Sequence, residues 1–216
     1  MSTFIEPLIL YAVLFFRISA GSVLSGEMPD NIVEFSVITE MVRIFLYNIP
    51  SLALVWYLLL KVKGLKEWGI TLPGKRDLVP AGIALPALVL IGLSISLASR
   101  HFDDIPSGSR FLPPQNFIAW VILIISCISA AYLEESFFRF YLLSKRKEMG
   151  LGGHRAVLVS VASFSLCHVY EGPWGFLNAV LSGVILAFVF LRFRSLHGIA
   201  FAHALYNVLV YVLGTA

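Results

Sequence analysis

Three apolar stretches of this 216-residue sequence carry polar side chains of the kinds that perform acid–base chemistry. An ionisable side chain inside a membrane-length apolar segment costs at least about 2.5–3.5 kcal/mol on insertion scales, so each one needs a partner or a function. Together such groups can supply a base, a proton carrier and hydrogen-bond donors. They are Glu134, Glu135 and Arg139 in the first stretch, His168 in the second, and His203 and Asn207 in the third.

The two adjacent glutamates are predicted to have different environments. Glu135 and Arg139 are four residues apart, so on a helix they share a face and can form an ion pair. Glu134 is rotated by about 100° from Glu135 and points elsewhere, because a helix has 3.6 residues per turn. A structural ion-pair cluster would explain one Glu–Arg pair but would leave the second glutamate as an uncompensated cost. We therefore predict that Glu134 is free for acid–base work.

The histidines complete a possible active site if the bundle brings them together. His203 and Asn207 are four residues apart and share a helix face, with a separation along the axis of about 6 Å. A lone histidine in an apolar helix is more often a hydrogen-bonded core residue. Because these residues are spread over three segments, we predict that Glu134, His168, His203 and Asn207 line one water-poor cavity. Such a cavity can activate water and stabilise an oxyanion.

Other catalytic arrangements fit the sequence less well. Cys167 lies next to His168, but neighbouring side chains on a helix diverge, and a buried cysteine is usually inert. A zinc site of Glu134, His168 and His203 is chemically possible, although it lacks the His-Glu-x-x-His helix of many zinc hydrolases. No metal or other cofactor is expected. Arg17, Arg43 and Asn48 could also line the cavity, although Arg43 is expected to extend toward the membrane interface.

The composition identifies the elements that must position these residues. The chain is 58% hydrophobic and 13% charged, with a mean hydropathy of +0.86, whereas a soluble domain is about one quarter charged. Most of its surface must therefore face lipid. At about 20 residues per crossing the length allows up to eight spans, so we expect one integral membrane domain over residues 1–216. No basic face indicates nucleic-acid binding.

Helices are the only sensible interpretation of the apolar segments, because backbone in lipid must satisfy its own hydrogen bonds. The predicted fold class is an all-α, polytopic transmembrane helical bundle of about seven to eight spans, with the motifs in a core of about residues 117–213. We recognise seven segments with these approximate limits: Pro7–Ser25, Glu40–Leu60, Leu78–Ala98, Phe117–Leu143, Arg155–Val169, Pro173–Leu191 and Leu196–Leu213.

Lysine and arginine gather in alternate loops, namely those after the second, fourth and sixth segments. The positive-inside rule then predicts a cytoplasmic N-terminus and an outside C-terminus. Glu134 lies about ten residues, or roughly 15 Å, before the predicted cytoplasmic end of its span. His203 lies about seven residues, or roughly 10 Å, after the cytoplasmic start of its own span. We therefore expect the cavity to open mainly toward the cytoplasm.

The three motifs, in this order on separate spans, resemble those of the CAAX-protease and bacteriocin-processing family (CPBP, or Abi) of intramembrane glutamic endopeptidases. They are Glu-Glu-x-x-x-Arg at residues 134–139, Phe-x-x-x-His at 164–168 and His-x-x-x-Asn at 203–207. The resemblance covers residues from about Ile118 to Leu213, and the first three segments match only as generic spans. It implies about eight helices, no required metal and, for a relative in a bacterium or archaeon, a plasma-membrane location.

The resemblance also implies a role for each motif residue. Glu134 would be the general base that activates water, and His168 would help to hold that water. His203 and Asn207 would stabilise the oxyanion, whereas Glu135 and Arg139 would position the site and the substrate. Phe164 would be a packing residue.

The expected function is therefore cleavage of membrane-anchored or lipidated proteins or peptides by a Glu-activated water. In the family, substrates include prenylated CAAX proteins, bacteriocin leaders and membrane-anchored proteins. Two other classes stay open. A bacteriocin-immunity or scaffold protein could keep the motifs and act by binding alone. A small proton-coupled transporter could use buried Glu and His as a relay, but it predicts inverted repeats, and the sequence has none.

Overall fold

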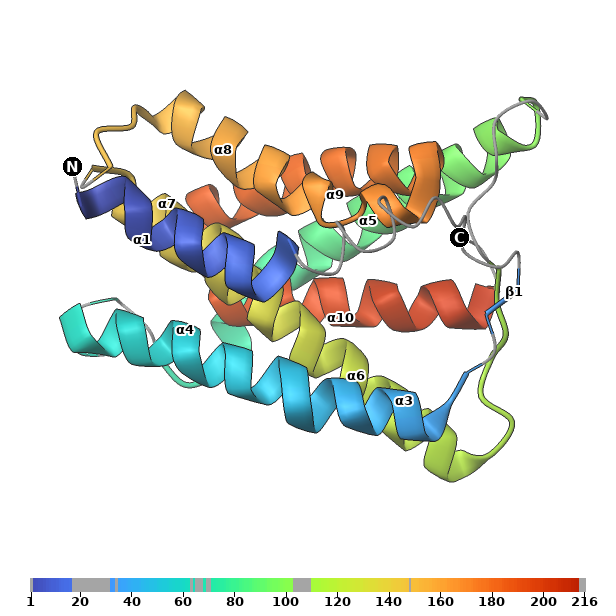
Figure 1. Cartoon of the computed structure of the whole chain (residues 1–216). Coiled ribbons are helices and arrows are strands. Elements are labelled where there is room, and N and C mark those ends of the chain that lie inside the picture. The colour runs from blue at the N-terminus through green and yellow to red at the C-terminus, as the bar shows by residue number, and fades with distance from the viewer. Residues whose placement is uncertain are drawn as a thin grey trace.

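The computed structural model describes most of the chain, and every structural statement below concerns that part. Its helices run roughly along one direction, with the N-terminus at one end of the bundle and the C-terminus at the other (Figure 1). The described residues are 2–16, 32–33, 35–62, 64, 68, 71–102, 110–147 and 149–213.

Long helices dominate the described residues, and several contain short π-helical or 3₁₀ segments. In chain order the elements are α1 (Ser2–Tyr11), η1 (Ala12–Phe16), β1 (Ile32–Val33), α3 (Val37–Val42), η2 (Arg43–Asn48), α4 (Ile49–Val62), η3 (Lys75–Asp77), α5 (Leu78–Ser99), β2 (Arg110–Phe111), α6 (Phe117–Glu134), η4 (Glu135–Tyr141), α7 (Leu142–Ser144), η5 (Lys145–Lys147), α8 (Gly153–Leu166), η6 (Val169–Glu171), α9 (Gly172–Phe193) and α10 (Leu196–Leu213). The strands are two residues each and pair in parallel, Ile32 with Arg110 and Val33 with Phe111.

The predicted all-α polytopic membrane fold is confirmed, and each of the seven predicted segments contains helix. Five helices in the described residues are long and apolar enough to cross a membrane: Val37–Lys61, Lys75–Ser99, Phe117–Lys147, Val169–Phe193 and Leu196–Leu213. The apolar helix Glu6–Phe15 is shorter. Helix α8 has 14 residues, which at 1.5 Å per residue is about 21 Å and less than the 30 Å hydrocarbon core.

Local sequence signals fix where two helices of the site, α6 and α9, begin. Asn116 precedes α6 in an extended conformation, and its side chain accepts a hydrogen bond from the Ala119 N–H at 2.9 Å. This satisfies one of the unpaired donors at a helix start. Gly172, the first residue of α9, has φ +79°, a left-handed conformation that favours glycine. Pro173 then occupies the first turn of α9, so the chain reverses sharply between α8 and α9.

The motif-bearing helices lie at the centre of the bundle. Helix α10 packs against α6 and α5, helix α9 packs against α8 and α5, and α4 contacts α6 from the other side. In Figure 1, α6 and α10 accordingly lie between the α3–α4 helix and the α8–α9 pair. The three motifs, which lie on α6–η4, at the end of α8 and on α10, therefore meet in the interior.

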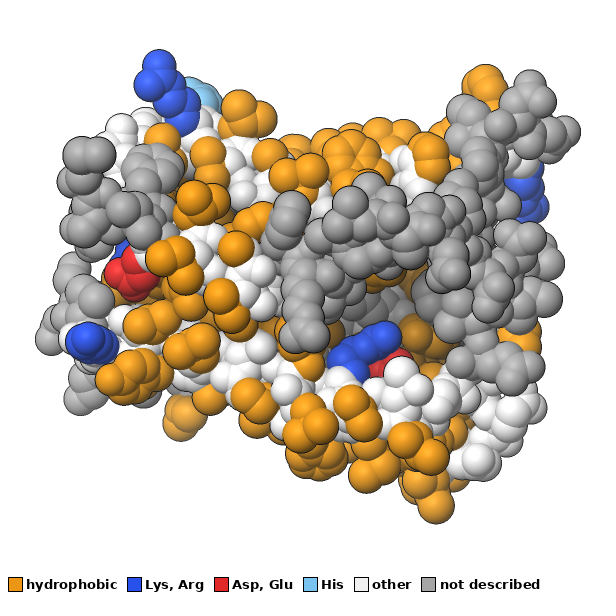
Figure 2. All heavy atoms as spheres, viewed as in Figure 1, with side chains coloured by type: hydrophobic (Ala, Val, Ile, Leu, Met, Phe, Trp, Pro, Cys, Tyr) orange, Lys and Arg blue, Asp and Glu red, His pale blue; other side chains and the backbone are white. Residues whose placement is uncertain are grey.

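Hydrophobic side chains cover most of the described surface between the two ends of the bundle, and charged side chains appear mainly near the ends (Figure 2). Leu46 is 75% exposed and Phe117 is 81% exposed, although both lie in helices of membrane-crossing length. An apolar surface of this extent is typical of a lipid-facing protein. The chain is therefore an integral membrane protein.

Candidate active site

The first motif lies where α6 changes to the π-helical segment η4, which begins at Glu135 and is buried along its whole length. Such segments are uncommon in helices and occur often at functional sites. Glu135 and Arg139 have no exposed surface, and the Arg139 Nη1 donates to Glu135 Oε1 at 3.1 Å. The predicted ion pair between these two residues is confirmed.

Arg139 makes two further contacts besides its ion pair with the Glu135 carboxylate. Its guanidinium lies over the Phe164 ring, with the carbon 4.1 Å from the ring centroid, a cation–π arrangement. Its Nη2 donates to the Gly183 carbonyl at 3.5 Å. A Cβ at Gly183 would lie 3.2 Å from the Phe164 ring, so this glycine allows α9 to approach the arginine closely.

His203 lies between the two glutamates. Its Nδ1 is 2.9 Å from Glu135 Oε1, and its Nε2 is 3.7 Å from Glu134 Oε2. A carboxylate only accepts hydrogen bonds, so Nδ1 donates to an ionised Glu135. The Nε2 edge of the ring then faces Glu134. Sequence reasoning predicted that His203 and Glu135 are both in the site but missed this direct contact, because it joins helices that are distant in the sequence.

Glu134 differs from its neighbour in the way that the sequence predicted. Its side chain is 21% exposed, whereas that of Glu135 is fully buried. Its Oε2 is buried and has no hydrogen-bond partner among the described residues. The Glu135 Oε2 likewise has no partner among these residues, so the feature that separates the two glutamates is the exposure of the Glu134 side chain.

His168 lies just beyond the end of α8, in the turn that leads to η6. Its Nδ1 is 2.9 Å from the carbonyl of Phe164, and its ring packs on the Phe164 ring with centroids 4.6 Å apart. The carbonyl can only accept, so Nδ1 donates and the neutral ring keeps an acceptor at Nε2. Phe164 thus contacts both the Arg139 guanidinium and the His168 ring, and its carbonyl binds His168 Nδ1.

One cavity of about 390 Å³ joins these groups. Glu134, His168, His203 and Asn207 all line it, so the prediction that these four residues share a cavity is confirmed. Asn207 is partly buried one turn after His203 on α10. A cavity of this size is within the range of small-molecule and peptide subsites.

Several other polar residues of the cavity were not predicted. Glu40 forms an ion pair with Arg43 at 3.2 Å and accepts a hydrogen bond from Ser126. Asn178 accepts from the Tyr206 hydroxyl at 3.1 Å. These residues lie outside the three motifs, so no spacing in the sequence pointed to them.

Of the three residues expected as possible cavity neighbours, only Arg43 is placed there. It lines the cavity and pairs with Glu40, with 49% of its side chain exposed. Asn48 is buried and donates from Nδ2 to Ser129 Oγ at 2.8 Å instead. Arg17 lies outside the described residues.

The lining of the cavity does not lie beside the basic loops, near which the sequence analysis expected the opening. On α6 the cavity is lined as far as Glu134 and not beyond, on α10 only from His203 onward, and on α9 only as far as Ser182. It therefore occupies the half of the bundle away from the basic loops. Counting residues to the span ends missed the reason, which is that large buried side chains fill the other half: Phe137, Phe138, Tyr141, Leu143, Leu186 and Phe190.

The comparison with protein families agrees with the motifs. Residues 115–209 match the family model described as type II CAAX prenyl endopeptidase Rce1-like. The chain contains an Rce1-like domain. The predicted resemblance to the CPBP family of CAAX proteases is thereby confirmed. Comparison with curated proteins and with solved structures gave no significant match.

The Rce1-like domain covers every motif residue, because it runs from just before α6 to the last turns of α10. The cavity also uses the preceding helices, through Glu40 and Arg43 of the α3–η2 helix and Gly92 of α5. Residues 115–209 therefore contain all the motif side chains, and the helices before them contribute part of the cavity wall.

Cys167 does not form a dyad with the adjacent His168. Its Sγ is 3.2 Å from the Ser163 carbonyl and 3.7 Å from the Tyr11 hydroxyl. Cys167 is not among the residues that line the cavity. Both cysteines are buried and free. Among the residues that the structure describes, no group of three His, Cys, Asp or Glu side chains could hold a metal ion.

Proposed function

We propose that this protein is an intramembrane glutamic endopeptidase in which Glu134 activates a water molecule for attack on a peptide bond. The match of residues 115–209 to the Rce1-like family supports the broader assignment as a CAAX-type protease. One observation supports the glutamic mechanism above the others. The Glu134 side chain is 21% exposed, whereas that of Glu135 is fully buried, and Glu134 lines a cavity that two imidazoles also line.

The first step is attack of water on the scissile carbonyl. Water between Glu134 and His168 donates one proton toward the Glu134 carboxylate and a hydrogen bond to His168 Nε2, which is the free acceptor because Nδ1 is bound to the Phe164 carbonyl. The water oxygen forms a bond to the carbonyl carbon, the C=O electron pair moves to the oxygen, and Glu134 becomes the carboxylic acid.

The second group of residues stabilises the resulting oxyanion. The Asn207 amide and the Nε2 edge of His203 lie on one face of α10 and line the same cavity. For His203 to donate from Nε2 while Nδ1 donates to Glu135, the ring must be an imidazolium. The charges of Glu134, Glu135, Arg139 and His203 then sum to zero, which lowers the cost of placing this cluster in a poorly solvated site.

The tetrahedral intermediate collapses when the C–N bond breaks. The leaving amine takes the proton that Glu134 received from water, so the enzyme returns to its starting protonation state. Glu135 and Arg139 act as positioning residues, because Glu135 holds the His203 ring and Arg139 holds both Glu135 and Phe164. The substrate is a membrane-anchored or lipidated protein or peptide.

The test is cleavage of a library of candidate lipidated and membrane-anchored peptides by the purified protein in liposomes. We expect Glu134→Gln to lose cleavage and to retain substrate binding, because the amide keeps the shape but cannot accept the proton. The matched control is Glu171→Gln, which changes another carboxylate of the same cavity and should retain turnover. Unchanged cleavage by Glu134→Gln would refute the mechanism, and a binding or scaffold role predicts that this variant keeps the full phenotype.

A further inference from the structure

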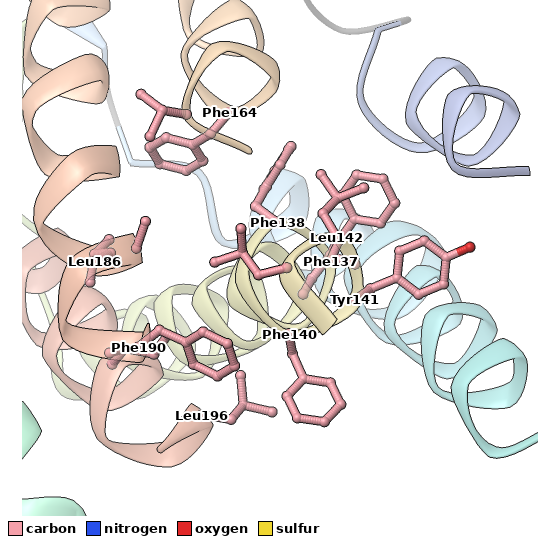
Figure 3. Packing of buried hydrophobic residues seen from close by; sticks show 14 of the residues in the cluster. Phe137, Phe138, Phe140, Tyr141, Leu142, Phe164, Leu186, Phe190 and Leu196 are labelled. Atoms are coloured by element: carbon pink, nitrogen blue, oxygen red, sulfur yellow. The ribbon is translucent and has the colours of Figure 1, made fainter. Parts of the chain in front are cut away.

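One face of helix α9 changes from polar to apolar along its length. Residues four apart lie nearly above one another on a helix, and one such row on α9 divides into two halves. Trp174, Asn178 and Ser182 form the first half, and all three line the cavity. Leu186 and Phe190 continue the row and are buried in the hydrophobic core (Figure 3). The row therefore carries polar side chains only where it borders the cavity.

Ser182, at the inner end of the polar half, has a buried hydroxyl without a partner. The residue is 5% exposed, and its Oγ makes no hydrogen bond within the described part of the chain. A serine in a membrane helix can donate to a carbonyl of the preceding turn, as Ser165 does to Val161 at 2.8 Å. Ser136 and Ser144 also lack a described partner, but they do not line the cavity. The Ser182 hydroxyl is thus a donor that a ligand in the cavity can use.

The other two polar side chains of the row also have unused donors. Trp174 Nε1 is buried and has no partner among the residues that the structure describes. The Tyr206 hydroxyl donates to Asn178 Oδ1 at 3.1 Å, and no described acceptor binds the Asn178 Nδ2. A Cβ at Gly92 of α5 would lie 2.5 Å from the Tyr206 hydroxyl, so this glycine leaves room for it. Tyr206 thereby holds the Asn178 amide with its N–H group available to a ligand.

The spacing of the three donors matches the repeat of an extended peptide. Four residues of α-helix rise about 6 Å, so the donors span about 12 Å along α9. In an extended strand, the carbonyls of alternate residues point to the same side and repeat about every 6.4–6.8 Å. Three such carbonyls span roughly 13 Å. The difference of about 1 Å is small enough for side-chain rotation to absorb.

The inner end of the row lies beside the proposed catalytic groups. Gly183 follows Ser182, and its carbonyl accepts from Arg139 Nη2 at 3.5 Å. A Cβ at Gly183 would lie 3.2 Å from the Phe164 ring, and the same ring packs on His168. A strand bound along the row would therefore bring the peptide bond at its inner end toward the catalytic groups that line the same cavity.

We propose that Trp174, Asn178 and Ser182 bind the main chain of the substrate in an extended conformation, each donating a hydrogen bond to the carbonyl of an alternate residue on one side of the scissile bond. This assignment rests on the proposed peptidase function. Every residue has a main-chain carbonyl, so these contacts recognise an extended segment and not a particular side chain, as strand addition does in peptide-binding domains. In a helical substrate the carbonyls are already bonded within the helix, so such a segment must unwind before it is cleaved.

The first test measures cleavage of a peptide in which single carbonyls are removed. The purified protein in liposomes is given a peptide that it cleaves, with each amide replaced in turn by a trans-alkene that keeps the shape. On one side of the scissile bond we expect kcat/KM to fall by about 2–13-fold at alternate positions, the effect of one ordinary hydrogen bond, and to change little between them. A flat pattern, or equal losses at neighbouring positions, would overturn the proposal.

Protein variants then identify the partner of each carbonyl. Trp174→Phe, Asn178→Ala and Ser182→Ala each remove one donor, so each should abolish the alkene penalty at one position, and Ser182→Ala should do so nearest the scissile bond. The matched control is Ser165→Ala, because this buried hydroxyl bonds within its own helix and does not line the cavity. The control should keep every penalty. Donor variants that lower kcat/KM and leave the alkene pattern unchanged would have a structural role only and would overturn the proposal.

Binding without cleavage separates this inference from the proposed function. The probe is a dye-labelled, capped peptide of sequence Ala-Leu-Ala-Leu-Ala, titrated against the protein in nanodiscs and followed by fluorescence anisotropy, with empty nanodiscs as background. We expect Ser182→Ala to raise the Kd by about 2–13-fold and Ser165→Ala to leave it unchanged. A failed proposed function would appear as absent peptide cleavage with this binding pattern retained. Absent binding, or equal Kd values for both variants and the unchanged protein, would overturn the inference.

Discussion

The ion pair of Glu135 and Arg139 allows a quantitative prediction, because neither residue has any exposed surface. Arg139→Met keeps much of the side-chain volume and removes the positive charge, which leaves Glu135 charged, buried and short of a partner. Breaking one side of a buried pair typically costs about 3–5 kcal/mol. At roughly 2–4 °C per kcal/mol for a chain of this size, the apparent Tm in detergent should fall by about 6–20 °C.

The matched control is Arg43→Met. This arginine also pairs with a nearby glutamate, Glu40 at 3.2 Å, but 49% of its side chain is exposed. The Glu40 side chain is only 7% exposed, but the Arg43 guanidinium keeps contact with solvent, so the control should lose clearly less stability than Arg139→Met. The measurement is thermal unfolding of each purified variant in the same detergent, followed by intrinsic fluorescence.

A double variant separates the charge effect from lost packing. Glu135→Gln combined with Arg139→Met removes both charges, so the unpaired carboxylate no longer exists. Residues in one network usually couple by about 0.5–3 kcal/mol, and the double variant should be less destabilised than the sum of the singles by such an amount. An Arg139→Met variant as stable as the Arg43→Met control, or a strictly additive double variant, would refute the buried-pair reasoning.

Three further predictions concern the cavity. Asn207→Ala should slow single-turnover cleavage by about 10²–10³-fold, the usual loss for one oxyanion donor, and an unchanged rate would remove Asn207 from that role. Cys167→Ser should keep its turnover, since no thiolate is used, and a folded, substrate-binding but inactive variant would favour thiol chemistry. Metal chelators should leave the cleavage rate unchanged in a time course with and without added zinc, whereas loss of activity that zinc restores would favour a metallopeptidase.

The sequence predicted the helical membrane fold and the shared cavity for one physical reason. Charged and polar side chains are costly in lipid, so those on Phe117–Leu143 and Leu196–Leu213 had to turn inward and meet. Helical spacing alone then separated the two glutamates, because Glu135 is one turn from Arg139 and Glu134 is not. The shared cavity and the separation of the two glutamates could both be predicted, because residue spacing along a helix and the cost of burying a charge can be worked out from the sequence.

Other features depend on contacts between distant segments and were not predicted. The His203–Glu135 hydrogen bond joins α10 to η4, and the Glu40–Ser126 bond joins α3 to α6. Helix α8 ends at Leu166, just before His168, and the chain turns at Gly172 with φ +79°; the apolar pattern reveals neither feature. The half of the bundle that holds the cavity was not predicted either, because it depends on where the large buried aromatic side chains pack.

The role of Glu134 is tested most directly by a single turnover in water enriched in ¹⁸O, with the enzyme in excess over a cleavable peptide. A general base delivers the water oxygen straight to the substrate carbonyl. We expect one ¹⁸O in the new carboxyl group of the product and none in the Glu134 side chain, both measured by mass spectrometry. A first-turnover product without ¹⁸O, together with label in Glu134, would show a covalent acyl intermediate and contradict the activation of water by this residue.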